Sequence, residues 1–129
     1  NFFKDLEFDD DEYNFIESKM LELKSLLKIK SAIRASYAKN KVATVIHSGD
    51  VDNGSILLKI RRKDSKACLV GKSLCNNGSY SWNLVSGNNN EWQEENTVNE
   101  KIEKEIRIDP DLWVLELESE TLWNPLEVL

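Results

Sequence analysis

The chain has 129 residues, of which 40% are hydrophobic and 31% are charged, and its formal net charge is −6. This length predicts one domain that can bury a core without cross-links. The negative charge argues against a nucleic-acid-binding protein, which carries a basic footprint. The sequence has no apolar run of the roughly 20 residues that a membrane-spanning helix needs.

The first 20 residues differ in composition from the rest of the chain. Seven of them are acidic, only Lys4 and Lys19 are basic, and aromatic side chains lie between the charges. Such a segment is typical of a mobile arm, or of one that docks its aromatic rings on the domain or on a partner. We predict an acidic arm over residues 1–20, followed by a single domain over residues 21–129.

Apolar residues then recur at three- and four-residue steps, as in an amphipathic helix. The stripe consists of Ile16, Met20, Leu23, Leu26, Leu27, Ile29, Ile33 and Tyr37. Asp10 or Asp11 suits the N-cap, and Lys39-Asn40-Lys41 suits the C-terminus, where cations meet the negative end of the helix dipole. The pattern predicts one long N-terminal helix.

Beyond residue 41 the apolar period changes to two. Four short segments are typical of strands, namely residues 42–48, 55–62, 66–73 and 79–86. Turn sequences separate them, among them Asn53-Gly54 and Asn76-Asn77-Gly78, which tolerate positive φ. Consecutive strands with tight links predict an antiparallel meander.

A shorter helix is predicted after residue 97. Thr97 and Glu100 have the spacing of a capping box. Pro110 ends this helix, because the residue before a proline is displaced from the helical region.

Residues 112–119 alternate in polarity and predict a last strand, with Trp113, Leu115 and Leu117 on one face. The fold class is therefore α+β, comprising a long N-terminal helix, an antiparallel meander of about four strands, a short second helix and a C-terminal strand.

Asp109 and Asp111 are the first candidates for chemistry, since paired carboxylates can bind a metal or share a proton. The sequence supplies no histidine or lysine beside them as an acid–base partner. We therefore interpret Asp109 as the stop of the second helix and Asp111 as a side chain that bonds to turn amides.

The remaining candidates do not form a recognisable catalytic or metal site. Residues 49–54, GDVDNG, lack the EF-hand spacing and predict a hairpin turn. His47 is the only histidine, and no close cysteine pair accompanies it. Cys68 and Cys75 are predicted as free thiols, with Cys68 buried, although a disulfide is compatible with an exported protein. We expect no enzyme activity, no cofactor and no metal.

Protein binding is the function that this composition favours. The basic run from Lys59 to Lys66 includes Arg61 and Arg62, and twelve carboxylates follow Asn90. The basic run is predicted to offset either the acidic arm or this acidic last third, and such opposite charges can hold an intramolecular contact or a homodimer. Contact residues for a partner protein are predicted to be Phe2, Phe3, Phe8, Trp92, Trp123, Arg61 and Arg62. Trp82 and Trp113 are instead predicted to pack in the core.

Two stretches, residues 42–71 and 103–119, carry a family pattern. The pattern comprises Gly49-Asp50, then Gly54 to Lys59, and later Arg107 to Glu118, with DPDLWV at its centre. It resembles DUF1491, an uncharacterised family of small alphaproteobacterial proteins, over about residues 21–119. The acidic arm, His47-Ser48 before Gly49 and the tail LWNPLEVL depart from that pattern. The family has no assigned activity, so the resemblance implies fold and lineage only.

The lysine- and asparagine-rich composition is typical of an AT-rich coding sequence. Together with the lineage it resembles secreted, Sec-exported effectors of Liberibacter-type bacteria, some of which are taken to inhibit papain-like cysteine proteases. This resemblance implies a secreted protein if Asn1 is a mature N-terminus, and a cytoplasmic one otherwise. The alternative is a cytosolic regulatory or assembly partner in an alphaproteobacterium.

Overall fold

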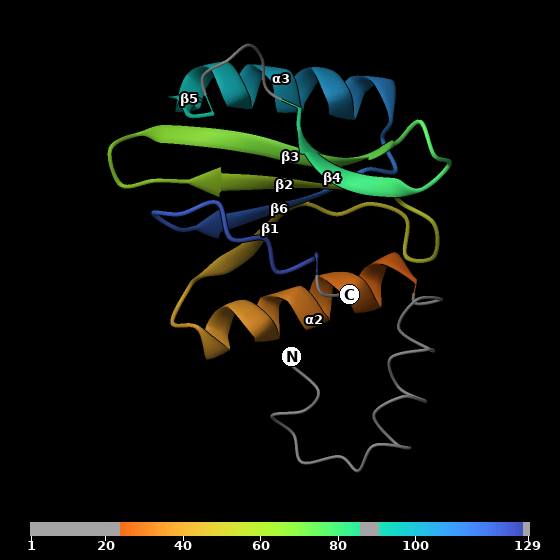
Figure 1. Cartoon of the computed structure of the whole chain (residues 1–129), viewed down its shortest axis with the longest axis horizontal. Coiled ribbons are helices and arrows are strands. Elements are labelled where there is room, and N and C mark those ends of the chain that lie inside the picture. Colours follow the sequence, from red (N-terminus) through yellow and green to blue (C-terminus); the bar gives the residue numbers. More distant parts are fainter. Residues whose placement is uncertain (1–23, 86–90, 128–129) are drawn as a thin grey trace.

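The structure is a computed structural model that describes residues 24–85 and 91–127 (Figure 1). In these ranges the elements are α2 (Ser25–Ala38), β1 (Ala43–His47), β2 (Ile56–Arg61), β3 (Lys66–Leu74), β4 (Tyr80–Leu84), β5 (Gln93–Glu94), α3 (Glu95–Ile108) and β6 (Trp113–Glu118). The predicted α+β class is confirmed. The predicted arm over residues 1–20 lies outside the described residues.

The sheet has six strands in the order β1-β6-β2-β3-β4, and β5 pairs with β3. β6 is antiparallel to β1 and parallel to β2. The prediction of a four-stranded meander is therefore wrong, because only β2, β3 and β4 form one. β6 lies between two neighbouring strands and most of its residues are buried, whereas residues of β1, at the edge, alternate between half-buried and exposed.

Among the described residues, one helix covers each face of the sheet (Figure 1). On one face, Ile29 and Ala32 of α2 pack against a core that includes Leu58 and Leu115. On the other face, Val98 and Ile102 of α3 pack against a second core. Adjacent residues of β6 point to opposite faces, so Trp113, Leu115 and Leu117 join the first core and Val114 the second. The predicted facing of this strand is confirmed.

The helix boundaries differ from those predicted. α2 spans 14 residues rather than forming a long helix, and residues 11–23 lie outside the described residues. Its first amides are satisfied by a distant loop, because those of Ser25 and Leu26 donate to the carbonyl oxygens of Asp52 and Val51.

The helix α3 begins at Glu95, so the predicted capping box at Thr97 is wrong. The amide of Glu95 donates to the carbonyl oxygen of Ser65 over 2.9 Å, so a tertiary contact sets the start. The predicted stop is confirmed, with Asp109 at the C-cap.

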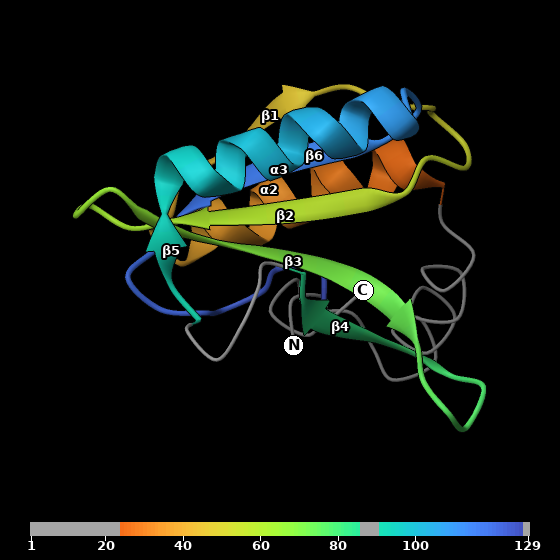
Figure 2. The same cartoon turned by 90° about the horizontal axis from the view of Figure 1, so that it is seen from above.

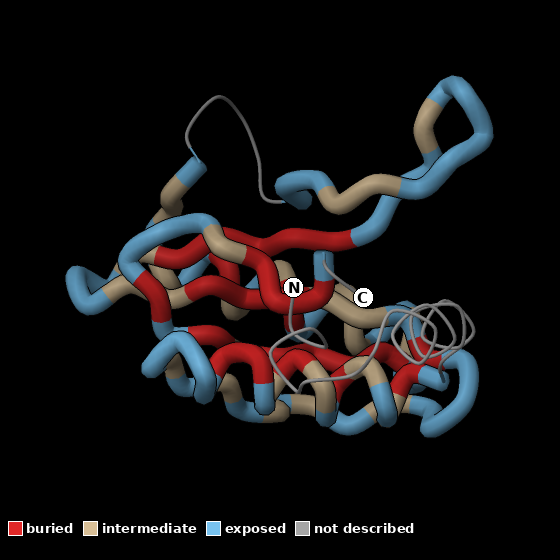
Figure 3. The backbone as a smooth tube through the Cα atoms, turned by 60° about the horizontal axis from the view of Figure 1, so that its bottom comes forward, coloured by how far each residue is buried: buried red, intermediate tan, exposed pale blue. Residues whose placement is uncertain are grey.

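The β3–β4 hairpin extends beyond the rest of the sheet (Figure 2). β3 pairs with β2 only as far as Gly71, whereas its pairing with β4 continues to Leu74. Gly78 in the hairpin turn has a φ of 84°, as the turn sequence predicts. The projecting part is half-buried or exposed, while the strands behind it are buried (Figure 3).

Candidate functional site

The two stretches that carry the family pattern contact each other. The amide of Asp50 donates to the carbonyl oxygen of Asp111 over 2.9 Å. The indole nitrogen of Trp113 donates to the carbonyl oxygen of Asp50 over 2.6 Å, and its amide donates to that of Ser55 over 2.8 Å. We call these contacts between residues 49–55 and 111–113 the loop junction.

Glycine is required at two positions of the loop junction. A Cβ on Gly49 would lie 2.1 Å from the carbonyl oxygen of Asp111, and one on Gly54 would lie 2.4 Å from it. Both contacts are to backbone, which cannot rotate away. The spacing of these glycines therefore reflects close packing rather than ligand binding.

Residues 49–54 form neither a hairpin turn nor a metal loop. β6 lies between β1 and β2, so the predicted hairpin is wrong, and Asn53 has no positive φ. The Asp50 carboxylate accepts hydrogen bonds from the amides of Asp52 and Asn53 at 3.1 and 2.7 Å. Within residues 24–85 and 91–127, no cluster of His, Cys, Asp and Glu could hold a metal ion.

Asp109 and Asp111 have different roles from those predicted for a carboxylate pair. Asp109 ends α3, and its Oδ1 accepts a hydrogen bond of 3.2 Å from the amide of Asp111. The turn bond thus belongs to the side chain of Asp109, and the prediction that Asp111 supplies it is wrong. Asp111 contributes its carbonyl oxygen to the loop junction instead.

The histidine and the cysteines lie in separate surroundings. His47 Nδ1 lies 2.6 Å from the carbonyl oxygen of Leu112. Both cysteines are free and Cys68 is buried, as predicted. Burial, together with the negative charge of the nearby Glu91, raises the pKa of the Cys68 thiol to about 11. A thiol with such a pKa is a poor nucleophile at neutral pH.

The basic run pairs with carboxylates from the last third of the chain, as the sequence predicts. Lys59 is buried on the α3 face of the sheet, and its Nζ lies 2.8 Å from Glu95 and 3.9 Å from Glu116. Arg61 reaches Glu95 at 3.0 Å and Glu118 at 3.3 Å. We call these five residues the ion network. The contact it makes is intramolecular, and a homodimer through these charges stays a prediction.

The predicted contact residues Trp92 and Trp123 are half-buried, and each makes a cation–π contact with a basic side chain of the same chain. The guanidinium of Arg62 lies 4.4 Å from the ring centroid of Trp92, and Lys39 Nζ lies 5.6 Å from that of Trp123. Arg62 also binds Asp64, and Arg61 belongs to the ion network. These residues therefore make intramolecular contacts, at separate places in the fold. Phe2, Phe3 and Phe8 lie outside the described residues.

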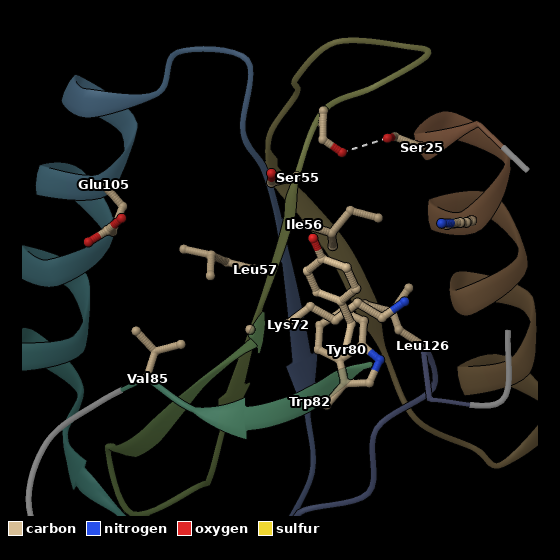
Figure 4. Close-up of a pocket in the computed structure, with 13 residues that line it drawn as sticks. Ser25, Ser55, Ile56, Leu57, Lys72, Tyr80, Trp82, Val85, Glu105 and Leu126 are labelled. Atoms are coloured by element: carbon tan, nitrogen blue, oxygen red, sulfur yellow. Dashed lines mark hydrogen bonds between the residues drawn. The ribbon is translucent and has the colours of Figure 1, made fainter. Parts of the chain in front are cut away.

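A groove of about 530 Å³ opens where the hairpin diverges from β2 (Figure 4). Its lining comes from α2, the start of β2, the hairpin and α3, and includes Ser55, Lys28, Lys72, Tyr80, Trp82 and Glu105. Sequence reasoning missed it, because these residues come from distant segments. Trp82 is half-buried here and packs against the first core from its edge, which agrees only partly with its predicted core position.

The hairpin presents one mainly apolar face, which also carries Lys72, and one polar face. Leu74 pairs with Tyr80, and all side chains on their face point to the side of the sheet that α2 covers. Their exposed fractions are 63% and 66%, and that of Leu84 is 42%. Ser73, Ser81 and Asn83 form the opposite face, where Asn83 donates to Ser73 over 2.6 Å. Exposed apolar groups that cluster in this way mark interaction surfaces.

These features define a class of protein. It is an α+β domain with a mixed sheet between two helices, and its described part offers a groove and an apolar hairpin rather than a cluster of reactive groups. In the same part, no helix is long and apolar enough to cross a membrane.

The chain belongs to the DUF1491 family. The family described as "Protein of unknown function (DUF1491)" matches residues 23–127. The chain is similar to the crystal structure of a DUF1491 family protein from Caulobacter crescentus CB15, with 26% identity, a TM-score of 0.68, and coverage of 83% of this chain and 94% of that one. A solution structure of an A. tumefaciens protein shares the fold, with 24% identity, a TM-score of 0.67, and coverage of 84% and 94%. No curated protein matches the chain.

Proposed function

We propose that this protein is a non-enzymatic binding module that pairs the outer edge of β4 with an extended segment of a partner protein. The observation that carries the proposal is that no described strand pairs with the outer edge of β4. Within the described residues β4 is the last strand on its side of the sheet. An extended peptide can add to such an edge through main-chain hydrogen bonds.

The backbone of β4 has groups available for this pairing. The amide of Val85 donates to the carbonyl oxygen of Leu69 over 2.7 Å, so Val85 faces β3. Hydrogen bonding alternates along an antiparallel strand, so the amides of Leu84, Trp82 and Tyr80 face away from β3. These amides form the row that a partner strand would pair with.

The two edges of the sheet differ in their protection. Proteins block edge strands with charges, prolines or bulges. β1 carries a register shift between Val45 and His47, typical of a bulge. β4, with the sequence YSWNL, carries no charge and no proline. This contrast supports binding at β4 rather than at β1.

The chemistry of the reactive side chains supports a role without catalysis. The raised pKa of Cys68 disfavours a thiolate nucleophile. His47 is engaged with a backbone carbonyl, and the carboxylates of Asp50 and Asp109 accept backbone amides.

Hydrogen exchange tests the proposal. Ten-residue peptides are selected from a displayed library on the full chain, and amide exchange is followed with and without the best binder. We expect slower exchange at Tyr80, Trp82 and Leu84. Leu84→Lys and Leu74→Lys are expected to weaken binding at least about tenfold, because a lysine places charge on the apolar face. Leu27→Lys on α2, where the leucine is 46% exposed, is the matched control.

Two outcomes contradict the proposal. One is protection that appears on α2 or α3 and not on β4. The other is an equal loss of binding in the Leu27→Lys control, which would mean that the hairpin has no special part.

For the setting, we propose a secreted effector that binds a host protein, with a papain-like cysteine protease as the specific target. The composition and the resemblance of the sequence support this version. The alternative is a cytosolic regulatory or assembly partner, which the free Cys68 and Cys75 favour, because reduced thiols are typical of the cytosol.

Titration of papain with the full chain tests the protease version. We expect inhibition that Leu84→Lys abolishes and Leu27→Lys preserves. An unchanged papain rate at a large excess of the chain would reject protease inhibition and leave the binding module to the peptide experiment.

A further inference from the structure

We propose that the groove between α2 and the β3–β4 hairpin binds a small organic anion, with its acid group between Lys28 and Lys72 and its planar body against Tyr80 and Trp82. This inference goes beyond the proposed protein binding, because it assigns a small-molecule site to the side chains that line the groove, and neither Leu74 nor Leu84 is among them.

The groove has the size and the lining of a ligand site. Its volume of about 530 Å³ lies inside the roughly 300–1,000 Å³ usual for small-molecule pockets. Leu57, Val85 and Leu126 supply apolar surface, and the hydroxyl groups of Ser55 and Tyr80 supply neutral donors. Figure 4 shows the hydroxyl end of Tyr80 directed toward the start of β2. This combination of apolar walls with few polar groups is typical of a site for an organic ligand.

Glycine helps to shape the groove. Gly71 lies where β3 parts from β2, and a Cβ there would come within 3.0 Å of both Leu57 and Val85. The absent side chain lets these two apolar residues approach each other at the wall. The same residue marks the end of the β2–β3 pairing, beyond which the groove opens.

The charges that line the groove are unbalanced. Lys28 comes from α2 and Lys72 from β3, and among the described residues neither forms an ion pair with a carboxylate. Glu105 is the acidic residue of the lining, and its Oε1 lies 3.0 Å from Lys101 Nζ on its own helix. The groove therefore keeps positive charge that the described part of the protein leaves uncompensated.

The two ammonium groups repel each other. Burial lowers the pKa of Lys28, and the positive charge of Lys72 lowers it further. An anion between them would offset both effects, because it supplies the opposite charge that favours the protonated form. The fold therefore places two like charges in one groove, and a bound anion would reduce the repulsion between them.

The aromatic side chains of the groove favour an anion with a planar organic body over an inorganic ion. Lys72 Nζ lies 5.6 Å from the ring centroid of Trp82, so the cation and the ring form one surface. Tyr80 lies two residues away on the same face of β4 and lines the same groove. A planar ligand body would pack against these rings while its acid group contacts the lysines.

Titration of the ¹⁵N-labelled full chain tests the site by NMR. The probes are phenyl phosphate, benzoate, inorganic phosphate and neutral benzyl alcohol. We expect phenyl phosphate or benzoate to shift the signals of the amides of Lys28, Ser55 and Lys72 and of the indole of Trp82. Its affinity should be at least about tenfold higher than that of inorganic phosphate or benzyl alcohol. The tighter of the two aromatic anions identifies the acid group as phosphate or carboxylate.

Variants on α2 separate the groove from general surface charge. Lys28→Gln is expected to weaken binding at least tenfold, and Lys28→Arg to retain most of it. Lys30→Gln removes an exposed lysine from the same helix outside the lining and should leave binding unchanged. Removal of a partly buried, repelled charge should not lower the thermal stability, so a folded Lys28→Gln protein is expected.

Three results would overturn the proposal: no shifts at millimolar anion, equal binding of benzyl alcohol, or equal weakening by Lys30→Gln. The variants that test the groove are on α2 and leave β4 unchanged. The variants that test peptide pairing are at Leu74 and Leu84, which do not line the groove. Failure of either proposal is therefore distinguishable from failure of the other.

Discussion

Trp113 and Asp50, 63 residues apart, are joined by a hydrogen bond of 2.6 Å from the indole nitrogen to the backbone carbonyl oxygen. The ring of Trp113 is buried in the first core, so this bond ties the loop before β2 to the central strand β6. The loop also accepts the first amides of α2. One side chain therefore helps to fix a helix, a loop and a strand together.

Trp113→Phe is expected to destabilise the fold by about 2 kcal/mol. The ring volume is mostly kept, but the partly buried carbonyl of Asp50 loses its donor. Urea unfolding measures the change, with Trp123→Phe, at a half-buried indole, as the control. Equal losses in the two variants would show that the hydrogen bond contributes nothing beyond ring size.

Gly49→Ala is expected to cost about 3 kcal/mol, because the new methyl group overlaps the backbone of Asp111 and Leu112. Gly78→Ala is the control. Its Cβ meets nothing within 4 Å, and its positive φ costs about 1–2 kcal/mol. Free energies of unfolding from urea titration compare the two, and a smaller loss at Gly49 would contradict the close packing described for the loop junction.

Glu95→Gln is expected to reduce stability at pH 7 by roughly 1–3 kcal/mol, since a charged hydrogen bond is lost. In the native protein the hydrogen bond from Lys59 and that from Arg61 hold the pKa of Glu95 below its usual value of 4.5. A depressed pKa gives stability that is present above 4.5 and is lost as the pH falls through the lower, folded value.

Urea unfolding between pH 7 and pH 3 measures this pH dependence. The difference between native protein and Glu95→Gln should shrink as the pH falls below 4.5. Glu100→Gln, at an exposed position on the same helix, should give a nearly constant difference. A Glu95→Gln difference that stays constant to pH 3 would contradict the role of the ion network.

The buried thiol of Cys68 is expected to resist modification in the native protein. With a pKa of about 11, roughly one thiol in a thousand is ionised at pH 8. The Cys75→Ser variant should react with dithiobis(nitrobenzoate) at least about a hundredfold more slowly in buffer than in guanidinium. The reference is about 6 M guanidinium, a concentration that unfolds most domains of this size. Rapid native labelling would contradict this inertness and make Cys68 a candidate nucleophile.

The residues of the loop junction were visible in the sequence, but their purpose was not. The spacing of Gly49, Asp50 and Gly54 and the DPDLW motif marked two stretches as special. From the sequence we interpret the carboxylates of this motif as a helix stop and a turn, which does not reveal the contact between the two stretches. Only the contact between Gly49 and the carbonyl oxygen of Asp111 identifies the constraint as backbone packing.

The sequence by itself determined the class and the facing of the strands. The alternation in residues 113–118 assigned Trp113, Leu115 and Leu117 to one face, because successive side chains of a strand point to opposite sides. Pro110 and Asp109 likewise placed the end of α3, because proline restricts the residue before it. These are local rules, and they held.

Only the tertiary structure decided which strands pair and what the charges do. Every residue except proline carries the same backbone donor and acceptor, so periodicity does not reveal that β6 lies between β1 and β2. The sequence does not distinguish Lys59 from Lys28. In the structure Lys59 is buried against Glu95, whereas Lys28 lines a groove together with Lys72. Their difference arises from neighbours that the chain brings together over long separations, since electrostatic energy depends on burial and distance in space.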